Sequence, residues 1–236
     1  MKKVMFFAFV TFCAVMLQSA GAMAQIASVE DNYRQIRSLS CRFDSVVFNS
    51  KGRVESKSRL ILDGENRRLD CVSPDRMAFM FFRDSYSVYS YQDKKMVVKK
   101  LSELSDAHRI FTEELFWTIL YDPFKIFYER FLPLLPSERS VAKSPVTMMS
   151  RRDPDSRVVI SFAGPIITSA EYYTKNQLTK RITMSDPVES NGVRIPSRAD
   201  IRIFSSGREM MRIQLSVSEI EINKTVPEKV FTRVDQ

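Results

Sequence analysis

The feature that most restricts the fold of this chain is a repeated alternation of apolar and polar residues. In residues 54–62, for example, Leu60 and Leu62 fall on the side opposite Lys57 and Arg59. A period of two is typical of strands with one buried and one solvated face, so it predicts antiparallel sheet. The same pattern returns later in the chain, at Leu178, Ile182 and Met184, at Ile201 and Ile203, and at Ile213, Leu215 and Val217.

Turn-forming residues separate the alternating segments. They occur at Lys51-Gly52, Gly64, Lys175-Asn176, Asn191-Gly192 and Ser206-Gly207. Short connections of this kind join neighbouring antiparallel strands. Many strands at regular spacing with little helix between them predict a mainly β fold with a few helices (α+β). Its large antiparallel sheet would be open or rolled into a barrel.

A short helix is expected in residues 28–38, before the first strand. Val29, Tyr33 and Ile36 recur there at helical spacing, and Ser28 is a suitable N-cap. The helix should therefore bury one apolar stripe against the sheet.

A second helical region is expected in residues 102–132. Its large apolar residues, which include Trp117, recur with a helical period, and Asp122-Pro123 divides the region into two pieces. The second piece extends through Phe131 before Pro133 ends it. Two interpretations fit this pair of helices: they complete the core of the sheet, or they form a movable cover over a cavity.

The N-terminus has the features of an export signal. Two lysines precede the apolar run Val4–Leu17, and Ala22 and Ala24 provide the small residues that signal peptidase requires. The run is shorter than the roughly 20 residues that span a bilayer, which disfavours the alternative of a membrane anchor. The sequence predicts a signal peptide over residues 1–24, cleaved after Ala24, and a soluble exported chain, residues 25–236, that forms one domain.

Charge and motif content argue against catalysis and nucleic-acid binding. The predicted leader holds two of the 36 basic side chains and none of the 28 acidic ones, and no run of Lys and Arg exceeds two residues. His108 is the only histidine, and no phosphate-binding glycine loop, C-x-x-C or G-x-S-x-G motif occurs. We therefore expect no enzyme activity, no metal, no cofactor and no nucleic-acid partner.

Cys41 and Cys71 remain after removal of the leader, and an exported pair can form a disulfide. In the expected meander, Cys41 pairs near Ile61 and Ile61 pairs near Arg68. The cysteines would then lie two strands apart, at a separation of about 10 Å. A disulfide requires Cα atoms within about 7 Å, so both cysteines are expected to be unbonded.

The chain carries more apolar surface than a one-sided sheet needs. Residues 77–82 are apolar on both faces, so both must be covered, although a run without alternation does not reveal which side chains point inward. Methionine is unbranched and flexible, which suits ordinary core filling or a pocket that repacks around acyl chains. The methionines concerned are Met77, Met80, Met148, Met149, Met184, Met210 and Met211.

Several segments, taken in order, carry a resemblance to a known family. They are residues 35–39 at the end of the first helix, 41–47 with Gly52 and 58–62 in the first two strands, 84–91 in a later strand, and 223–231 near the C-terminus. Together they resemble the periplasmic outer-membrane lipoprotein carrier family, LolA. The similarity covers residues 28–100 and 157–232. After Leu62 the family typically has a basic residue and a proline, where this chain has Asp63-Gly64-Glu65, so the lid latch is not identified.

The resemblance implies an unclosed antiparallel β-barrel, or strongly curved sheet, with a helical lid over a hydrophobic cavity. The cavity would hold lipoprotein acyl chains during periplasmic transit, without covalent chemistry. An inner-membrane ABC transporter would load the carrier, which is expected to be a monomer, and an outer-membrane acceptor would empty it. The expected cavity-lining residues are Phe43, Leu60, Leu62, Met77, Phe79, Val88, Trp117, Ile182, Met184 and Ile203.

A second function class fits the same fold. The chain could be a regulatory, sensor or structural module of the cell envelope that binds a partner protein or a different lipid. A carrier predicts a continuous apolar interior reached from one rim. A protein-binding module predicts a filled interior and an apolar patch on the exterior.

Overall fold

The structure is a computed structural model that describes residues 28–64, 66–82, 85–100, 103, 131–133 and 145–232. One antiparallel sheet contains all the strands in these residues. The predicted signal peptide, His108, Trp117 and nearly all of the expected second helical region lie outside these residues. The antiparallel, mainly β architecture predicted from the alternating segments is confirmed. The predicted helical lid falls outside the described residues.

The sheet has 13 strands. They are β1 (Ser38–Asn49), β2 (Gly52–Asp63), β3 (Asn66–Ser73), β4 (Met77–Phe82), β5 (Ser85–Ser90), β6 (Lys95–Lys100), β7 (Phe131–Pro133), β8 (Val146–Ser150), β9 (Ser156–Ala163), β10 (Ile166–Thr174), β11 (Gln177–Ser190), β12 (Val193–Ser205) and β13 (Arg208–Ile222). Their order across the sheet is β6-β5-β4-β3-β2-β1-β13-β12-β11-β10-β9-β8-β7. The sheet therefore consists of two meanders joined in the middle by the pairing of β1 with β13.

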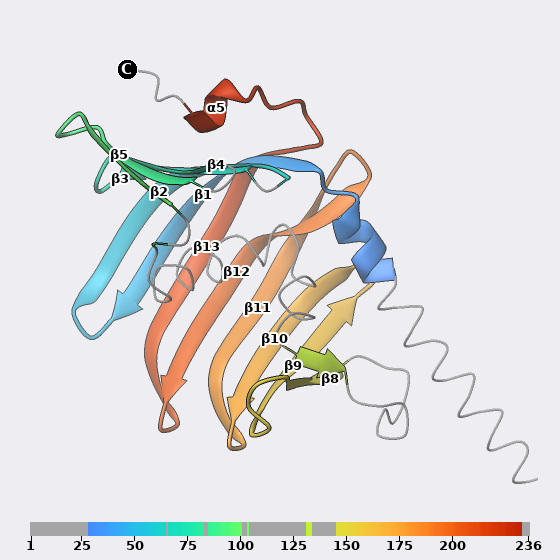
Figure 1. The fold of residues 1–236 in the computed structure, drawn as a ribbon. Helices are drawn as coiled ribbons and strands as arrows, with labels where there is room; N and C mark the ends of the chain where they lie inside the picture. The colour runs from blue at the N-terminus through green and yellow to red at the C-terminus, as the bar shows by residue number, and fades with distance from the viewer. Residues whose placement is uncertain are drawn as a thin grey trace, which may run out of the picture.

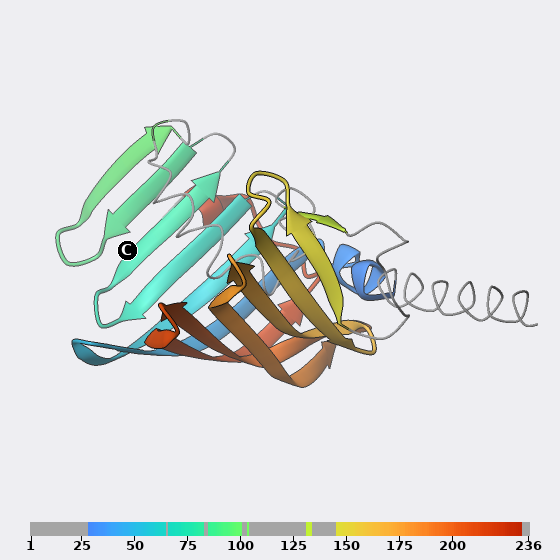
Figure 2. The same ribbon diagram turned by 90° about the horizontal axis from the view of Figure 1, so that it is seen from below.

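The sheet is strongly curved. Figures 1 and 2 show the strands of the first meander and those of the second as two arms on either side of a bowl. Strands β6 and β7 stand at the two ends of the order, so the sheet is not closed into a barrel. We call the concave side, which bears Leu60 and Ile182, the inner face and the opposite side the outer face.

The predicted hairpin turns are present, with the backbone conformation that such turns require. Asn191 and Gly192 have φ values of 50° and 76°, and Ser206 and Gly207 have values of 50° and 75°. Each pair connects two strands whose neighbouring residues are directly paired. Positive φ at both central residues is typical of the two-residue turns that match strand twist, and Asn and Gly adopt it readily.

The predicted first helix is confirmed, although it ends at residue 34 and not at 38. Val29, Tyr33 and Ile36 are all buried in the main core, as their spacing predicted. Asn32 fixes the helix to the sheet: its Nδ2 donates to the Arg194 carbonyl at 2.7 Å, and its Oδ1 accepts from the Arg194 N–H at 3.0 Å. The helix therefore lies at the start of β12.

A short C-terminal helix, α5 (Lys229–Thr232), packs on the outer face over β3 and β4 (Figure 1). Phe231 is 1 % exposed. Ala78 and Met80 are fully buried, yet both lie outside the main core cluster. The two faces of residues 77–82 are thereby distinguished, because Ala78 and Met80 face α5 whereas Phe79 and Phe81 face the main core.

Three details differ from the sequence predictions. Phe131 begins strand β7, where a helix was expected to end. Cys41 pairs with Leu60, the neighbour of the predicted Ile61, because the turn at residues 50 and 51 pairs Asn49 with Gly52 and so fixes the register of β1 with β2. Val54 lies on the predicted apolar side of β2 but is half exposed, since the tip of the β1–β2 hairpin extends beyond the core.

The candidate lipid site on the inner face

Apolar residues form a continuous row across the inner face of the first meander. We call it the β1–β6 row, and neighbouring members are directly paired between adjacent strands. Exposure increases along the row, from 0 % at Leu60 to 54 % at Val97. Because directly paired residues point to the same face, the row is a track that leads from the core to an edge of the sheet. Its members are Cys41, Leu60, Leu69, Phe79, Val88 and Val97.

A second apolar row crosses the inner face of the other meander. Pairing aligns one residue from each of six neighbouring strands, β13 to β8. Val47 of β1 pairs with Ile213 and extends this row across the centre of the sheet. The inner face is therefore apolar from arm to arm. The row consists of Ile213, Ile201, Ile182, Ala170, Ile160 and Val146.

All the predicted cavity-lining residues that the structure describes lie on the inner face. Leu60, Phe79 and Val88 belong to the β1–β6 row, and Ile182 belongs to the second row. The others occupy neighbouring inner positions of β1, β2, β4, β11 and β12: Phe43, Leu62, Met77, Met184 and Ile203. Trp117 lies outside the described residues. The structure thus brings these side chains to one face, and their role in lining a cavity remains a prediction.

The methionines are spread over both faces and do not gather around one space. Met184 is buried on the inner face, Met80 is buried on the outer face under α5, and Met210 is exposed. Core filling explains the first two. The methionine pattern in the sequence was therefore a weaker guide to a lipid site than the alternation of the strands.

The cysteine prediction is confirmed, because Cys41 and Cys71 are both free thiols. Burial raises the pKa of Cys41 to about 12. Burial also raises the pKa of Cys71, although a hydrogen bond with Ser58 opposes the change. Since the thiolate is the nucleophilic form, neither thiol is activated for chemistry.

Polar groups interrupt the inner face at a few positions that the sequence analysis did not identify. The ammonium group of Lys180 lies 4.0 Å from the centre of the Tyr172 ring. At the edge strand β6, Lys95 and Lys99 point to the same face as Val97, because they pair with Ser90 and Tyr86. The available signal was that Lys95 and Lys99 each stand two residues from Val97, the spacing that places strand residues on one face.

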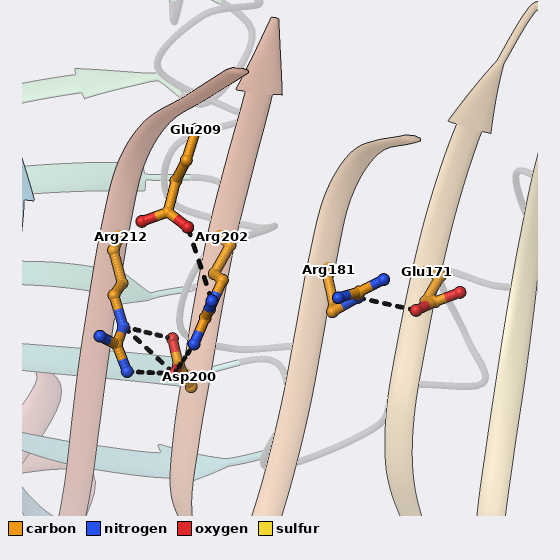
Figure 3. Close-up of polar contacts among 6 residues, drawn as sticks. All are labelled: Glu171, Arg181, Asp200, Arg202, Glu209 and Arg212. Carbon is orange, nitrogen blue, oxygen red and sulfur yellow. Dashed lines mark hydrogen bonds and ion pairs between the residues drawn. The ribbon is translucent and has the colours of Figure 1, made fainter. Parts of the chain in front are cut away.

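The outer face of the second meander carries a network of ion pairs (Figure 3). Asp200 accepts hydrogen bonds from Arg212, the shortest at 2.6 Å, and from Arg202 at 3.2 Å. Arg202 also lies 3.6 Å from Glu209. Desolvation opposes ionisation of Asp200, but the hydrogen bonds from both arginines prevail and lower its pKa. The two faces of this arm therefore differ sharply, with apolar residues inside and paired charges outside.

A separate polar hollow of about 620 Å³ lies between helix 28–34 and the chain that follows β13. Two of its cations have acidic neighbours: Arg34 lies 3.2 Å from Glu30, and Lys224 lies 2.7 Å from Glu221. Its polar lining does not suit an acyl chain. The residues around it include Arg34, Arg37, Ser38, Asp63, Asn223 and Lys224.

Within the described ranges, no group of His, Cys, Asp and Glu side chains is arranged to hold a metal ion. In the same part of the chain, no helix is long and apolar enough to cross a membrane. The paired apolar rows of the inner face offer contact to an apolar ligand, and the few polar groups beside them can orient a charged end of that ligand.

Comparison with known proteins adds information about the fold. No protein family profile matches this chain, and no curated protein matches it in sequence. Among solved structures, a LolA superfamily protein from Nitrosomonas europaea is similar, with a TM-score of 0.56 and 13 % sequence identity. The similarity covers 88 % of this chain and 97 % of that protein.

Two further solved structures give the same result. A DUF1329 family protein from Desulfovibrio piger has a TM-score of 0.58 at 11 % identity, over 90 % of this chain and 96 % of that one. A putative outer-membrane lipoprotein-sorting protein domain from Vibrio parahaemolyticus has a TM-score of 0.54 at 11 % identity, over 89 % and 97 %. The resemblance found in the sequence is therefore confirmed at the level of architecture: this chain has a LolA-like fold.

Proposed function

We propose that this protein is a periplasmic carrier that binds the acyl chains of lipoproteins on its inner face and moves them from the inner to the outer membrane. The observation that supports this most directly is the continuity of the two apolar rows across the curved sheet. Many members of these rows are buried, with Leu60 at 0 % and Ile182 at 4 % exposure, so an alkyl chain would contact them by replacing the groups that cover them. The binding needs no covalent step, and none is proposed.

The energetics require partners on both sides of the transfer. Each methylene group that leaves water contributes about 0.8 kcal/mol, so an acylated protein is held strongly both by a membrane and by an apolar carrier. Loading therefore needs an energy source, for which an inner-membrane ABC transporter is the expected partner. Release needs an outer-membrane acceptor with a still more favourable site. The carrier itself would act as a monomer after cleavage of the signal peptide.

The first test is native mass spectrometry of Gln25–Gln236, purified from the periplasm without detergent, followed by identification of any co-purifying molecule. Bound acylated protein or lipid would support the carrier. If the protein is recovered free and neither a triacylated lipopeptide nor lipid binds when added, the carrier function is wrong.

A matched pair of variants tests whether the inner face is the binding surface. Val88 and Tyr89 are neighbours on β5 that point to opposite faces and are both partly buried. Val88→Glu places a carboxylate among the apolar side chains of the inner face and should weaken binding of a triacylated lipopeptide about tenfold or more. Tyr89→Glu places the same charge on the outer face and should leave binding nearly unchanged. Equal loss in both variants would contradict an inner-face site.

One observation favours a second candidate function. On its outer face, strand β6 exposes two apolar residues, Met96 and Val98, which are 45 % and 61 % exposed. An exterior apolar patch is what an envelope module that binds a protein partner would present. Recovery of a stoichiometric protein partner without bound lipid, in the purification described above, would support this candidate over the carrier.

A further inference from the structure

Strand β6 has a different character on each of its faces. On the inner face it presents Lys95, Val97 and Lys99, whereas Met96 and Val98 lie on the outer face. All of its residues are exposed, and β6 is the terminal strand of the described sheet. The inner face of the edge strand is thus one apolar residue with a lysine on either side.

Val97 is also the exposed end of the β1–β6 row. It pairs with Val88, which pairs with Phe79, and the row continues to the fully buried Leu60. An alkyl chain laid along this row would pass from solvent to the core while contacting one apolar side chain per strand. Neighbouring strands are about 4.8 Å apart, so the five steps from Val97 to Cys41 span about 24 Å, enough for a long acyl chain.

The two lysines are available for an incoming anion. No ion pair joins Lys95 or Lys99 to a carboxylate among the described residues, and the nearby Asp93 is hydrogen-bonded to Ser90 at 2.9 Å. Their Cα atoms are about 13 Å apart along the strand. Lysine has a flexible four-carbon stem, so both ammonium groups can turn toward one group held above Val97.

We propose that the inner side of β6 is a binding site for the phosphate of a single anionic lipid, whose acyl chain lies along the β1–β6 row. This inference rests on the proposed acyl-binding function and adds the headgroup chemistry and the edge at which the lipid enters. Lys95 and Lys99 are the phosphate ligands, and Val97 supports the first part of the chain. A lipid fits better than an extended acidic peptide, because the apolar track continues inward on one face only.

The test compares two probes that share one acyl chain. Palmitoyl lysophosphatidic acid carries a phosphate, whereas 1-palmitoylglycerol does not. With the chain Gln25–Gln236, we expect the phosphate probe to bind more tightly than the neutral one. The double variant Lys95→Glu/Lys99→Glu should weaken binding of the phosphate probe about tenfold or more and leave the affinity for the neutral probe unchanged. Lys94→Glu/Lys100→Glu is the matched control, with the same net charge away from the inner face, and should change either affinity less than about twofold.

The outcomes separate this inference from the function on which it rests. If the wild type binds both probes equally, or if both lysine pairs cause the same loss, the phosphate site is wrong while acyl binding stands. If neither probe binds, the proposed function fails as well. Displacement of the phosphate probe by a hexaglutamate peptide would assign the edge to a protein partner and overturn the lipid site. All four lysines are exposed or in a turn, so these variants should fold.

A second pair of variants tests the track itself. Val97→Asn and Val98→Asn make the same change on opposite faces of one exposed strand. Only Val97→Asn should weaken binding of 1-palmitoylglycerol, by about threefold, because a polar amide then lies under the alkyl chain. The same loss in Val98→Asn would show that the row does not guide the chain.

Discussion

The guanidinium group of Arg68 donates a hydrogen bond of 2.7 Å to the carbonyl oxygen of Val230, which lies 162 residues further along the chain. The Nε of Arg68 also lies 2.9 Å from both carboxylate oxygens of Asp70. Strand β3 therefore holds the C-terminal helix on the outer face through a largely buried arginine. The predicted meander placed Arg68 and Asp70 on one strand, but the sequence did not indicate that α5 packs beside that strand.

Arg68→Ala should lower the free energy of unfolding by about 3 kcal/mol, because it leaves the partly buried Asp70 without its cation. Burial already raises the pKa of Asp70 although Arg68 opposes the change. Adding Asp70→Asn to Arg68→Ala should recover part of the loss. Arg42→Ala, which breaks an exposed pair with Glu219, is the control and should cost less than about 1 kcal/mol in urea unfolding. A single Arg68→Ala no more harmful than Arg42→Ala would contradict this role.

Phe231 anchors α5, so its truncation should be costly in spite of the shortness of the helix. Phe231→Ala removes a fully buried ring and should destabilise the protein by about 3 kcal/mol in chemical unfolding. Exposed Thr232 provides the control, and Thr232→Ala should change stability by less than about 0.5 kcal/mol. Loss of α5 should also uncover Met80, measurable as increased oxidation of that residue by peroxide. Unchanged oxidation would indicate that another segment covers it.

The ion pairs around Asp200 predict a pH dependence with a defined sign. A carboxyl group whose pKa is lowered in the folded state stabilises it above the unfolded pKa of about 4, and this contribution disappears as the pH falls through the folded pKa. Asp200→Asn should therefore lower Tm at pH 7 by roughly 2–4 °C, the effect of about 1 kcal/mol, and the difference should vanish near pH 2. Arg212→Gln should likewise lower Tm at pH 7, and its difference from the wild type should also vanish near pH 2. A difference that is constant with pH would exclude the ionic contribution.

The two cysteines should differ in reactivity without being bonded. In the folded chain Gln25–Gln236 at pH 8, Cys41 should not react with a thiol reagent, and Cys71 should react slowly, since burial raises the pKa of both thiols and Cys41 is the more deeply buried. Both should react at once in guanidinium chloride. Cys71→Ser should leave a thiol that appears only on unfolding. An intact mass lower by the two hydrogens of a disulfide would contradict the structure.

The strands and turns were predictable because their signal is local. Alternation around Leu60 and Ile213, and turns such as Asn191-Gly192, depend only on neighbouring residues. The helical spacing of Val29 and Tyr33 likewise identified the helix that packs on the core. Placement of the predicted apolar residues on one face followed from the same period of two.

The remaining features depend on contacts between distant parts of the chain. The orientation of residues 77–82 is decided by α5, a helix of four residues that is too short to show a helical period in the sequence. The pairing of β1 with β13 shifts by a bulge near Cys41, which a strand pattern does not reveal. The lysines of β6 resembled a solvated face, and only the pairing of Val97 with Val88 connects them to the inner face.

The position of β1 in the sheet has a consequence for how the chain reaches its native state. Every other pairing in the described sheet joins strands that are consecutive in the chain, so each arm can form from local hairpins as they become available. The junction of the arms requires Leu39 to meet Ile222, and pairing over such a long interval is slow. Until β13 is available, one edge of β1 stays unpaired and the second meander is not joined to the first. A chain that crosses a membrane N-terminus first would thus stay incompletely folded until nearly all of it had passed, and folding would be completed by its last strand.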